Sequence, residues 1–312
     1  MAHTLVIDTS YGSTVGIVGH EPIVETDSRT HVERLQANIA KVVADAGLTP
    51  ADLDHVVVGV GPAPFTGLRA GIVVAKALAF ATGARLVGHD VLEPQAQWNL
   101  IRRGQAGTLG DRKPCHVLTL AVNDARRKQL YFALYDSPLG RDGDGEAQAR
   151  PLIAMDIDYP SSIVERVNKA VRAYASSADG DIVVDVIGHG AEKYADILHG
   201  IERIGDVDDA SVLDQGAHGL SIFAADAMLA HTHDSDSPES VEPLYLRRPD
   251  AEVPAPLKHV LGHGAASKTD AHDDGAHGGS SRPQAAHAAI DAAVPAQTVH
   301  DAHDARSAGD AR

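Results

Sequence analysis

Short apolar runs, separated by glycines and polar turns, set the pattern of the first hundred residues. The runs are too short for helices and carry β-branched residues, so they predict strands at 5–8, 14–18, 23–26, 56–60 and 85–88. Between these runs, apolar residues recur at spacings of three and four, which predicts helices at 32–46, 67–82 and 91–103. The chain therefore begins as an α/β unit that opens with three consecutive strands.

Similar patterns return after a glycine-rich connector at 104–113. Apolar runs predict strands at 116–122, 129–135 and 182–187, and helical spacing predicts two more helices at 160–176 and 220–231. The element order of the first half resembles an RNase H-like unit, which the actin, Hsp70 and sugar-kinase superfamily carries twice. We therefore predict an α/β fold of two RNase H-like lobes, at 1–103 and 114–250.

The last sixty residues differ from everything before them. Residues 253–312 contain no Phe, Tyr or Trp and are rich in Ala, His, Asp and Gly. Such a segment buries too little apolar surface to offset the entropy lost on ordering. We predict a disordered tail.

Composition narrows the range of functions. The net charge of −16 repels phosphate backbones, so binding of RNA requires a more basic partner. Cys115 is the only cysteine, which excludes a disulfide framework and a cysteine zinc site. The N-terminus has no signal-peptide pattern, and we expect no apolar stretch to reach the length of a membrane span. These features predict a cytoplasmic protein without membrane contact.

The segment before the helix at 67–82 has the strongest chemical signature. It reads Gly-Val-Gly-Pro-Ala-Pro-Phe-Thr-Gly-Leu-Arg over 59–69. Gly61 and Pro62 end the preceding strand, and Thr66 is a favourable N-cap. A loop that ends on a helix N-terminus can offer N–H groups to an anion, although a tight turn without a ligand has the same sequence requirements.

Five segments, in order and register, resemble the bacterial TsaB (YeaZ) family over about residues 1–250. They are Leu5-Val6-Ile7-Asp8-Thr9-Ser10, His31-Val32-Glu33-Arg34-Leu35, the loop at 59–69, Asp124-Ala125-Arg126-Arg127 followed by Leu130-Tyr131, and Pro243-Leu244-Tyr245-Leu246-Arg247. The family usually has Gly-Ser where this chain has Ala63-Pro64. That change stiffens the loop and removes a hydroxyl, which weakens the case for a phosphate there.

The resemblance implies a scaffold without catalytic residues or a cofactor of its own. TsaB supports TsaD, which with the ATPase TsaE transfers a threonylcarbamoyl group from threonylcarbamoyl-adenylate to the adenosine after the anticodon of tRNAs that read codons beginning with A. For this chain it implies a TsaD-like partner bound through a helical bundle, a TsaE-like ATPase, and tRNA reached only through the complex. A homodimer is an alternative assembly.

In the family, the helices at 32–46 and 67–82 hold the partner. In the second helix small residues recur every four positions, and the stripe they form lets another helix approach closely, while Leu68, Ile72 and Leu78 can face the sheet. The predicted interface residues are Val32, Leu35, Ile39, Val43, Gly67, Gly71, Ala75 and Ala79. Packing of the two helices within the chain is the alternative interpretation.

The superfamily's phosphate and adenosine loops have weak counterparts here. Asp8, Thr9 and Ser10 stand where the first phosphate hairpin would lie, and Gly188 and Gly190 stand where an adenosine loop would lie. Both segments lack parts of a working site, so we interpret them as remnants at which residual binding of ATP or ADP is left open. Plain turns between elements are the alternative.

Two enzyme classes and one binding function remain as alternatives. An actin-like kinase would need a second acidic phosphate hairpin, and an M22-type metallopeptidase would need metal ligands in the folded body; neither is evident. His259 and His263 have the spacing of a helical metal pair, but they lie in the histidine-rich tail, so we predict no metal site. A free-standing binding module is the third alternative.

Overall fold

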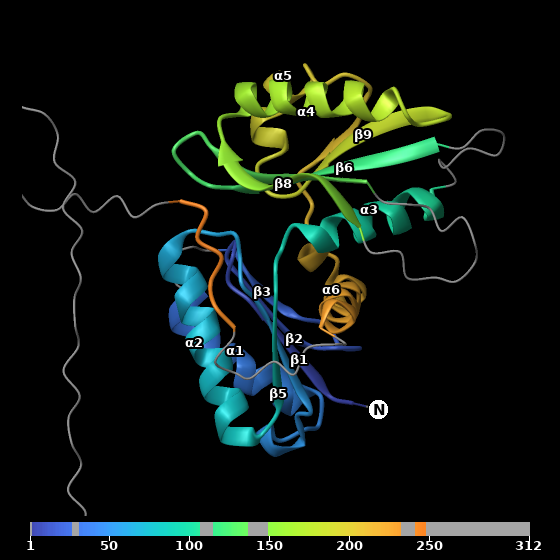
Figure 1. Ribbon diagram of the computed structural model, residues 1–312. Coiled ribbons are helices and arrows are strands. Elements are labelled where there is room, and N and C mark those ends of the chain that lie inside the picture. The colour runs from blue at the N-terminus through green and yellow to red at the C-terminus, as the bar shows by residue number, and fades with distance from the viewer. Residues whose placement is uncertain (1, 27–30, 107–114, 137–148, 232–240, 248–312) are drawn as a thin grey trace, which may run out of the picture. The chain divides into compact units, whose positions relative to one another are not determined.

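The computed structural model describes residues 2–26, 31–106, 115–136, 149–231 and 241–247. They belong to one compact unit, Met1–Ala251, and the predicted disordered tail lies outside the described residues. This unit contains two five-stranded sheets, each with helices packed on it (Figure 1). The predicted class, two α/β lobes, is confirmed.

The first sheet has the strand order β3-β2-β1-β4-β5. Its strands are β1 (Thr4–Asp8), β2 (Ser13–Ile17), β3 (Ile23–Glu25), β4 (His55–Gly59) and β5 (Arg85–His89). β1 pairs antiparallel with β2 and parallel with β4, and β4 pairs parallel with β5. The sheet is therefore mixed, with its parallel part at the centre and at one edge.

Helices cover both faces of this sheet, which explains the unbroken valine run in β4. Val56 and Val58 pack in one core with α1 (His31–Asp45) and α2 (Phe65–Thr82). Val57 points the other way, into a core that it shares with α6 (Gly216–Ala230). Because side chains alternate along a strand, a run of valines supplies both cores at once.

The second sheet repeats this topology. Its order is β10-β9-β6-β7-β8, with β6 antiparallel to β7 and parallel to β9, as β1 is to β2 and β4. The strands are β6 (Cys115–Asp124), β7 (Leu130–Asp136), β8 (Arg150–Asp158), β9 (Asp181–Ile187) and β10 (Ile204–Asp208). α4 (Pro160–Ala175) and α5 (Ala195–Leu198) belong to this lobe. The 3₁₀ turns within the described residues are η1 (Pro50–Asp52), η2 (Glu192–Tyr194) and η3 (Val212–Asp214).

Two helices cross between the lobes. α3 (Glu93–Gln105) contacts β6, β7 and β9 of the second sheet, although it follows directly on β5. Conversely, α6 comes late in the chain and contacts β1, β2 and β5 of the first sheet. The boundaries at 1–103 and 114–250 remain a prediction, and a division by packing would exchange these two helices.

Several elements differ from the sequence prediction. β8 and β10 were not predicted, because both are edge strands that bury only part of each side chain and so lack a clear apolar alternation. α2 begins at Phe65 rather than after Thr66, with Pro64 in the N-cap position and no side-chain cap. α6 begins at Gly216, four residues before its predicted start.

α2 also corrects the expectation about apolar stretches. It has 18 residues and a mean hydropathy of 1.4, enough by length and composition to cross a membrane, and within the described residues it is the one helix of that kind. The prediction missed it because half of its residues are small ones rather than large hydrophobes. Its buried side chains pack on the first sheet, so α2 is a core helix.

Candidate functional site

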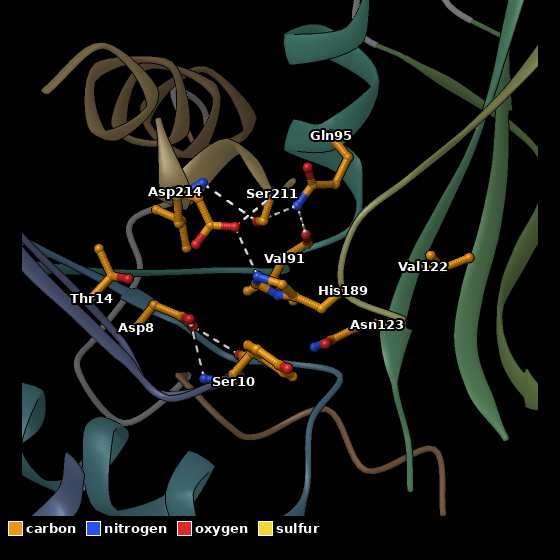
Figure 2. Close-up of a pocket in the computed structure, with 12 residues that line it drawn as sticks. Asp8, Ser10, Thr14, Val91, Gln95, Val122, Asn123, His189, Ser211 and Asp214 are labelled. Carbon is orange, nitrogen blue, oxygen red and sulfur yellow. Dashed lines mark hydrogen bonds and ion pairs between the residues drawn. The ribbon is translucent and has the colours of Figure 1, made fainter. Parts of the chain in front are cut away.

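The ends of β1 and β9 bring the two predicted nucleotide segments to one small cavity of about 20 Å³ (Figure 2). It is lined by Asp8, Ser10, Tyr11, Thr14, Val91, Gln95, Val122, Asn123, His189, Ser211, Leu213 and Asp214. This volume is enough for about one water molecule, whereas small-molecule sites usually offer roughly 300–1,000 Å³. Residues of both segments thus line one cavity, and the cavity itself has no room for a nucleotide.

Asp8 stands at the end of β1, and its carboxylate is bound by its own turn. The Ser10 amide and hydroxyl donate to it at 3.1 and 2.8 Å. Burial raises the pKa of Asp8 above its ordinary value despite these bonds. Gly59 lies so close that a Cβ there would sit 2.1 Å from Asp8 Oδ1, so the glycine is required by this contact.

His189 fills the other side of the cavity. Its ring stacks on Tyr11 with the centroids 3.8 Å apart, and its Nε2 lies 2.8 Å from Asp214 Oδ2. Burial favours a raised pKa for Asp214, but the hydrogen bond and charge of His189 lower it below its ordinary value. Tyr11, His189 and Asp214 therefore form a packed group where the resemblance would place an adenosine.

Three buried hydroxyl or amide oxygens of this region have no hydrogen-bond partner: Thr9 Oγ1, Ser13 Oγ and Asn123 Oδ1, of which only Asn123 lines the cavity. Unpaired buried polar atoms are costly and often mark a functional or formerly functional site. Binding of ATP or ADP at Asp8, Thr9, Ser10, Gly188 and Gly190 nevertheless stays a prediction.

The loop at 59–69 is held by side chains from the second sheet. Asn123 Nδ2 donates to the Pro62 carbonyl at 3.2 Å, and the Tyr131 hydroxyl donates to the Ala63 carbonyl at 3.3 Å. These bonds use backbone acceptors, so they tolerate Ala63 and the proline that follows it. The loop after β4 is thus bound to the second sheet through its backbone carbonyls.

A second, wider groove of about 870 Å³ lies beside the N-terminus of α2. Arg126, Arg127 and Lys193 line it, together with the turn at 9–12 and the carboxylates of Asp124 and Glu33. Lys193 pairs with Asp124 at 2.9 Å, so the hairpin group singled out in the sequence is partly an internal ion pair. Lys193 was missed because its link to the hairpin spans 69 residues.

The structure places most of the predicted interface residues inside the chain's own core. The buried ones are Leu35, Ile39, Val43, Gly71, Ala75 and Ala79, whereas Val32 and Gly67 are partly exposed. The prediction that the stripe of small residues on α2 faces a partner protein is therefore wrong. Small residues let α2 approach its own sheet: a Cβ on Gly71 would lie 2.3 Å from Thr9 Oγ1 of the loop after β1.

We expect Gly71→Ala to destabilise the fold by about 1–3 kcal/mol, because the added methyl group overpacks this contact. Urea unfolding measures the change. The double variant with Thr9→Ala removes both atoms that the methyl would meet first and should recover part of the loss. Equal stability of the single variant and the unmodified chain would contradict the close contact.

The outer face of α2 carries exposed apolar side chains. Phe80 is 90% exposed, Val73 64% and Phe65 49%. Between α1 and α2 lies a groove of about 360 Å³, lined by Val32, Glu33, Leu35, Gln36, Arg69, Ala70, Val73 and Val74. Phe65 is further fixed by stacking on Tyr245 at 4.9 Å, with the Arg69 guanidinium 4.1 Å over its ring.

Comparison with known proteins places this fold. Residues 18–255 match the family described as TsaD, tRNA N6-adenosine threonylcarbamoyltransferase. An uncharacterized protein of Mycobacterium tuberculosis (strain ATCC 25618 / H37Rv) is 33% identical over 255 residues, covering 80% of this chain and 93% of the relative. A tRNA N6-adenosine threonylcarbamoyltransferase of Ruegeria sp. is 38% identical over only 74 residues, 24% of this chain and 20% of the enzyme.

Among solved structures, YeaZ from Pseudomonas aeruginosa matches with a TM-score of 0.56. The match covers 79% of this chain and all of YeaZ at 23% sequence identity, so it shows that the two chains share a fold. The family match spans both lobes, and the resemblance read from the sequence is confirmed. The chain belongs to the TsaD/YeaZ family, with the two-lobed fold of its YeaZ members.

Proposed function

We propose that this protein is a non-catalytic scaffold that binds and supports a TsaD-like transferase in the synthesis of N6-threonylcarbamoyladenosine in tRNA. The observation that carries the proposal is the exposed apolar face of α2, with the groove between α2 and α1. Together, Phe80 and Val73 expose more apolar surface to water than a single surface residue does. The groove between the helices can accept side chains of a partner helix.

The cavity between the turns at 8–11 and 188–190 supports the non-catalytic part of the proposal. The Asp8 carboxylate is occupied by Ser10, and Tyr11 and His189 take up the space of a ligand. A TsaE-like ATPase and the tRNA would join through the transferase, since the acidic chain repels nucleic acid. The setting we propose is the cytoplasm.

The partner face differs from the one read from the sequence. Direct contact would come from the outer sides of the helices, through Val32, Gln36, Val73 and Phe80, while the small stripe holds α2 on its own sheet. A homodimer could use the same face, so the two assemblies would compete.

We expect Val73→Glu or Phe80→Glu to weaken binding of the TsaD-like protein from the same organism by roughly tenfold to a hundredfold, because each buries a charge at the contact. Calorimetric titration measures the affinity, and circular dichroism monitors the fold. Ile197→Glu, at a 45% exposed apolar residue of α5 in the second lobe, is the matched control and should bind normally. Undiminished binding by both α2 variants would reject this face.

A further inference from the structure

A cluster of acidic groups and one histidine lies where β5 ends and α3 begins. His89, Asp90 and Glu93 each offer a ligand atom, and these three atoms lie within 4.8 Å of one another. Asp226 of α6 joins them, with its Oδ2 3.1 Å from His89 Nε2. His89 and Asp90 are 4% and 9% exposed, so much of this charge is removed from water. The cluster is separate from the cavity and from the partner face described above.

The cluster is short of positive charge. Among the described residues neither Asp90 nor Glu93 forms an ion pair with a lysine or arginine, and Asp226 pairs with His89 alone. Three carboxylates around one imidazole cost free energy unless something compensates them.

Tyr135 of β7 adds an independent observation. It is only 3% exposed and packs in one core cluster with Leu92 of the β5–α3 junction. A largely buried polar side chain therefore lies close to the cluster.

We propose that His89, Asp90, Glu93 and Asp226 bind one divalent transition cation. Carboxylate oxygens with an imidazole nitrogen suit Mn²⁺, Fe²⁺ or Zn²⁺, whereas Mg²⁺ and Ca²⁺ prefer oxygen ligands alone. One oxygen of Asp90 is held by the amides of Leu92 and Glu93, both at 2.8 Å. Those bonds fix the carboxylate and leave its second oxygen for the metal.

The cation would be structural. Three of its ligands come from the β5–α3 junction and the fourth from α6, and these are the two segments that cross between the lobes. Binding would link α3 to α6 and stabilise both crossings by mass action. This role goes beyond the scaffold function and does not depend on it.

The test uses the full chain, freed of metal with a chelator. Mn²⁺ should raise its melting temperature by several degrees at a concentration about a hundredfold above Kd, and Mg²⁺ at the same concentration should not. Glu93→Gln should weaken the affinity for Mn²⁺, read from the concentration that shifts the melting temperature, at least tenfold. Asp226→Asn, in α6, should weaken it likewise. Glu165→Gln, at an exposed position of α4, is the control and should respond as the unmodified chain does.

Trp98 is a fluorescent probe close to the cluster. It is the only tryptophan, it lies five residues after Glu93 on α3, and its emission should be quenched by Co²⁺ bound nearby. Saturable quenching that disappears in Glu93→Gln would support the site. Metal uptake without a melting shift, or an equal shift in Glu93→Gln, would show adventitious binding, for instance by the seven tail histidines, and would overturn the proposal.

Discussion

Replacing Arg103 by methionine should lower the free energy of unfolding by about 3–5 kcal/mol, the usual cost of breaking a buried ion pair from one side. Arg103 Nε and its terminal nitrogen both donate to Asp185, whose side chain is fully buried in β9. Asn99 also donates to Asp185, at 2.8 Å. Without the Arg103 guanidinium, the buried carboxylate keeps neutral donors and one more distant cation, Arg102 at 3.9 Å, which pairs more closely with Asp206.

The pH dependence of the free energy of unfolding provides a second test of this prediction. Burial would raise the pKa of Asp185, but the hydrogen bonds from Arg103 and Asn99 lower it below the ordinary 3.8. In the unmodified chain the stabilising contribution of Asp185 is therefore present above about pH 4 and is lost as the pH falls through its lower folded value. In the variant the folded pKa rises, so protonation at acid pH relieves the unpaired charge. The stability gap should be widest near neutral pH and should narrow toward pH 4.

Urea unfolding at pH 7.5 and pH 4.5 measures both effects. Arg34→Met is the matched control, because Arg34 pairs with Glu25 at the surface, where its side chain is 60% exposed. Such surface pairs contribute less than about 1 kcal/mol. A loss for Arg103→Met that is no larger than that of the control would mean that Asp185 does not depend on its arginine.

The sequence predicts the secondary structure well wherever one physical signal dominates. The valine run of β4 and the three-four spacing of α1 are decided by burial, so both elements lie close to their predicted places. The repeated element order likewise predicts two similar lobes. Edge strands such as β8 carry partly exposed, mixed residues, and that signal is too weak to read from one chain.

The sequence is less informative about which face of a helix turns toward the sheet. The spacing of Gly71, Ala75 and Ala79 predicts a flat stripe, but a close sheet and a close partner helix require the same small residues. Long-range pairs are also invisible to local patterns. His189 meets Tyr11 across 178 positions, and His89 meets Asp226 across 137. The packed cavity and the acidic cluster therefore emerge only from the three-dimensional arrangement.

Phe223→Ala should destabilise the first lobe by about 3–5 kcal/mol, although the residue belongs to the last described helix. The Phe223 side chain is fully buried, packs with Val57 and Val87 of the first sheet, and meets His89 edge to face at 5.6 Å. Truncation removes that apolar contact area and leaves a cavity that the sheet closes only in part.

Phe80→Ala is the matched control, since Phe80 is 90% exposed on α2 and its loss should change stability by less than about 0.5 kcal/mol. Urea unfolding gives the overall change, and amide hydrogen exchange of β1, β4 and β5 shows where it acts. Faster exchange in those strands for Phe223→Ala would support the crossing of α6 onto the first sheet. Faster exchange confined to β6, β7 and β9 would instead place α6 with the second lobe, and a loss equal to that of Phe80→Ala would mean that Phe223 is not part of a packed core.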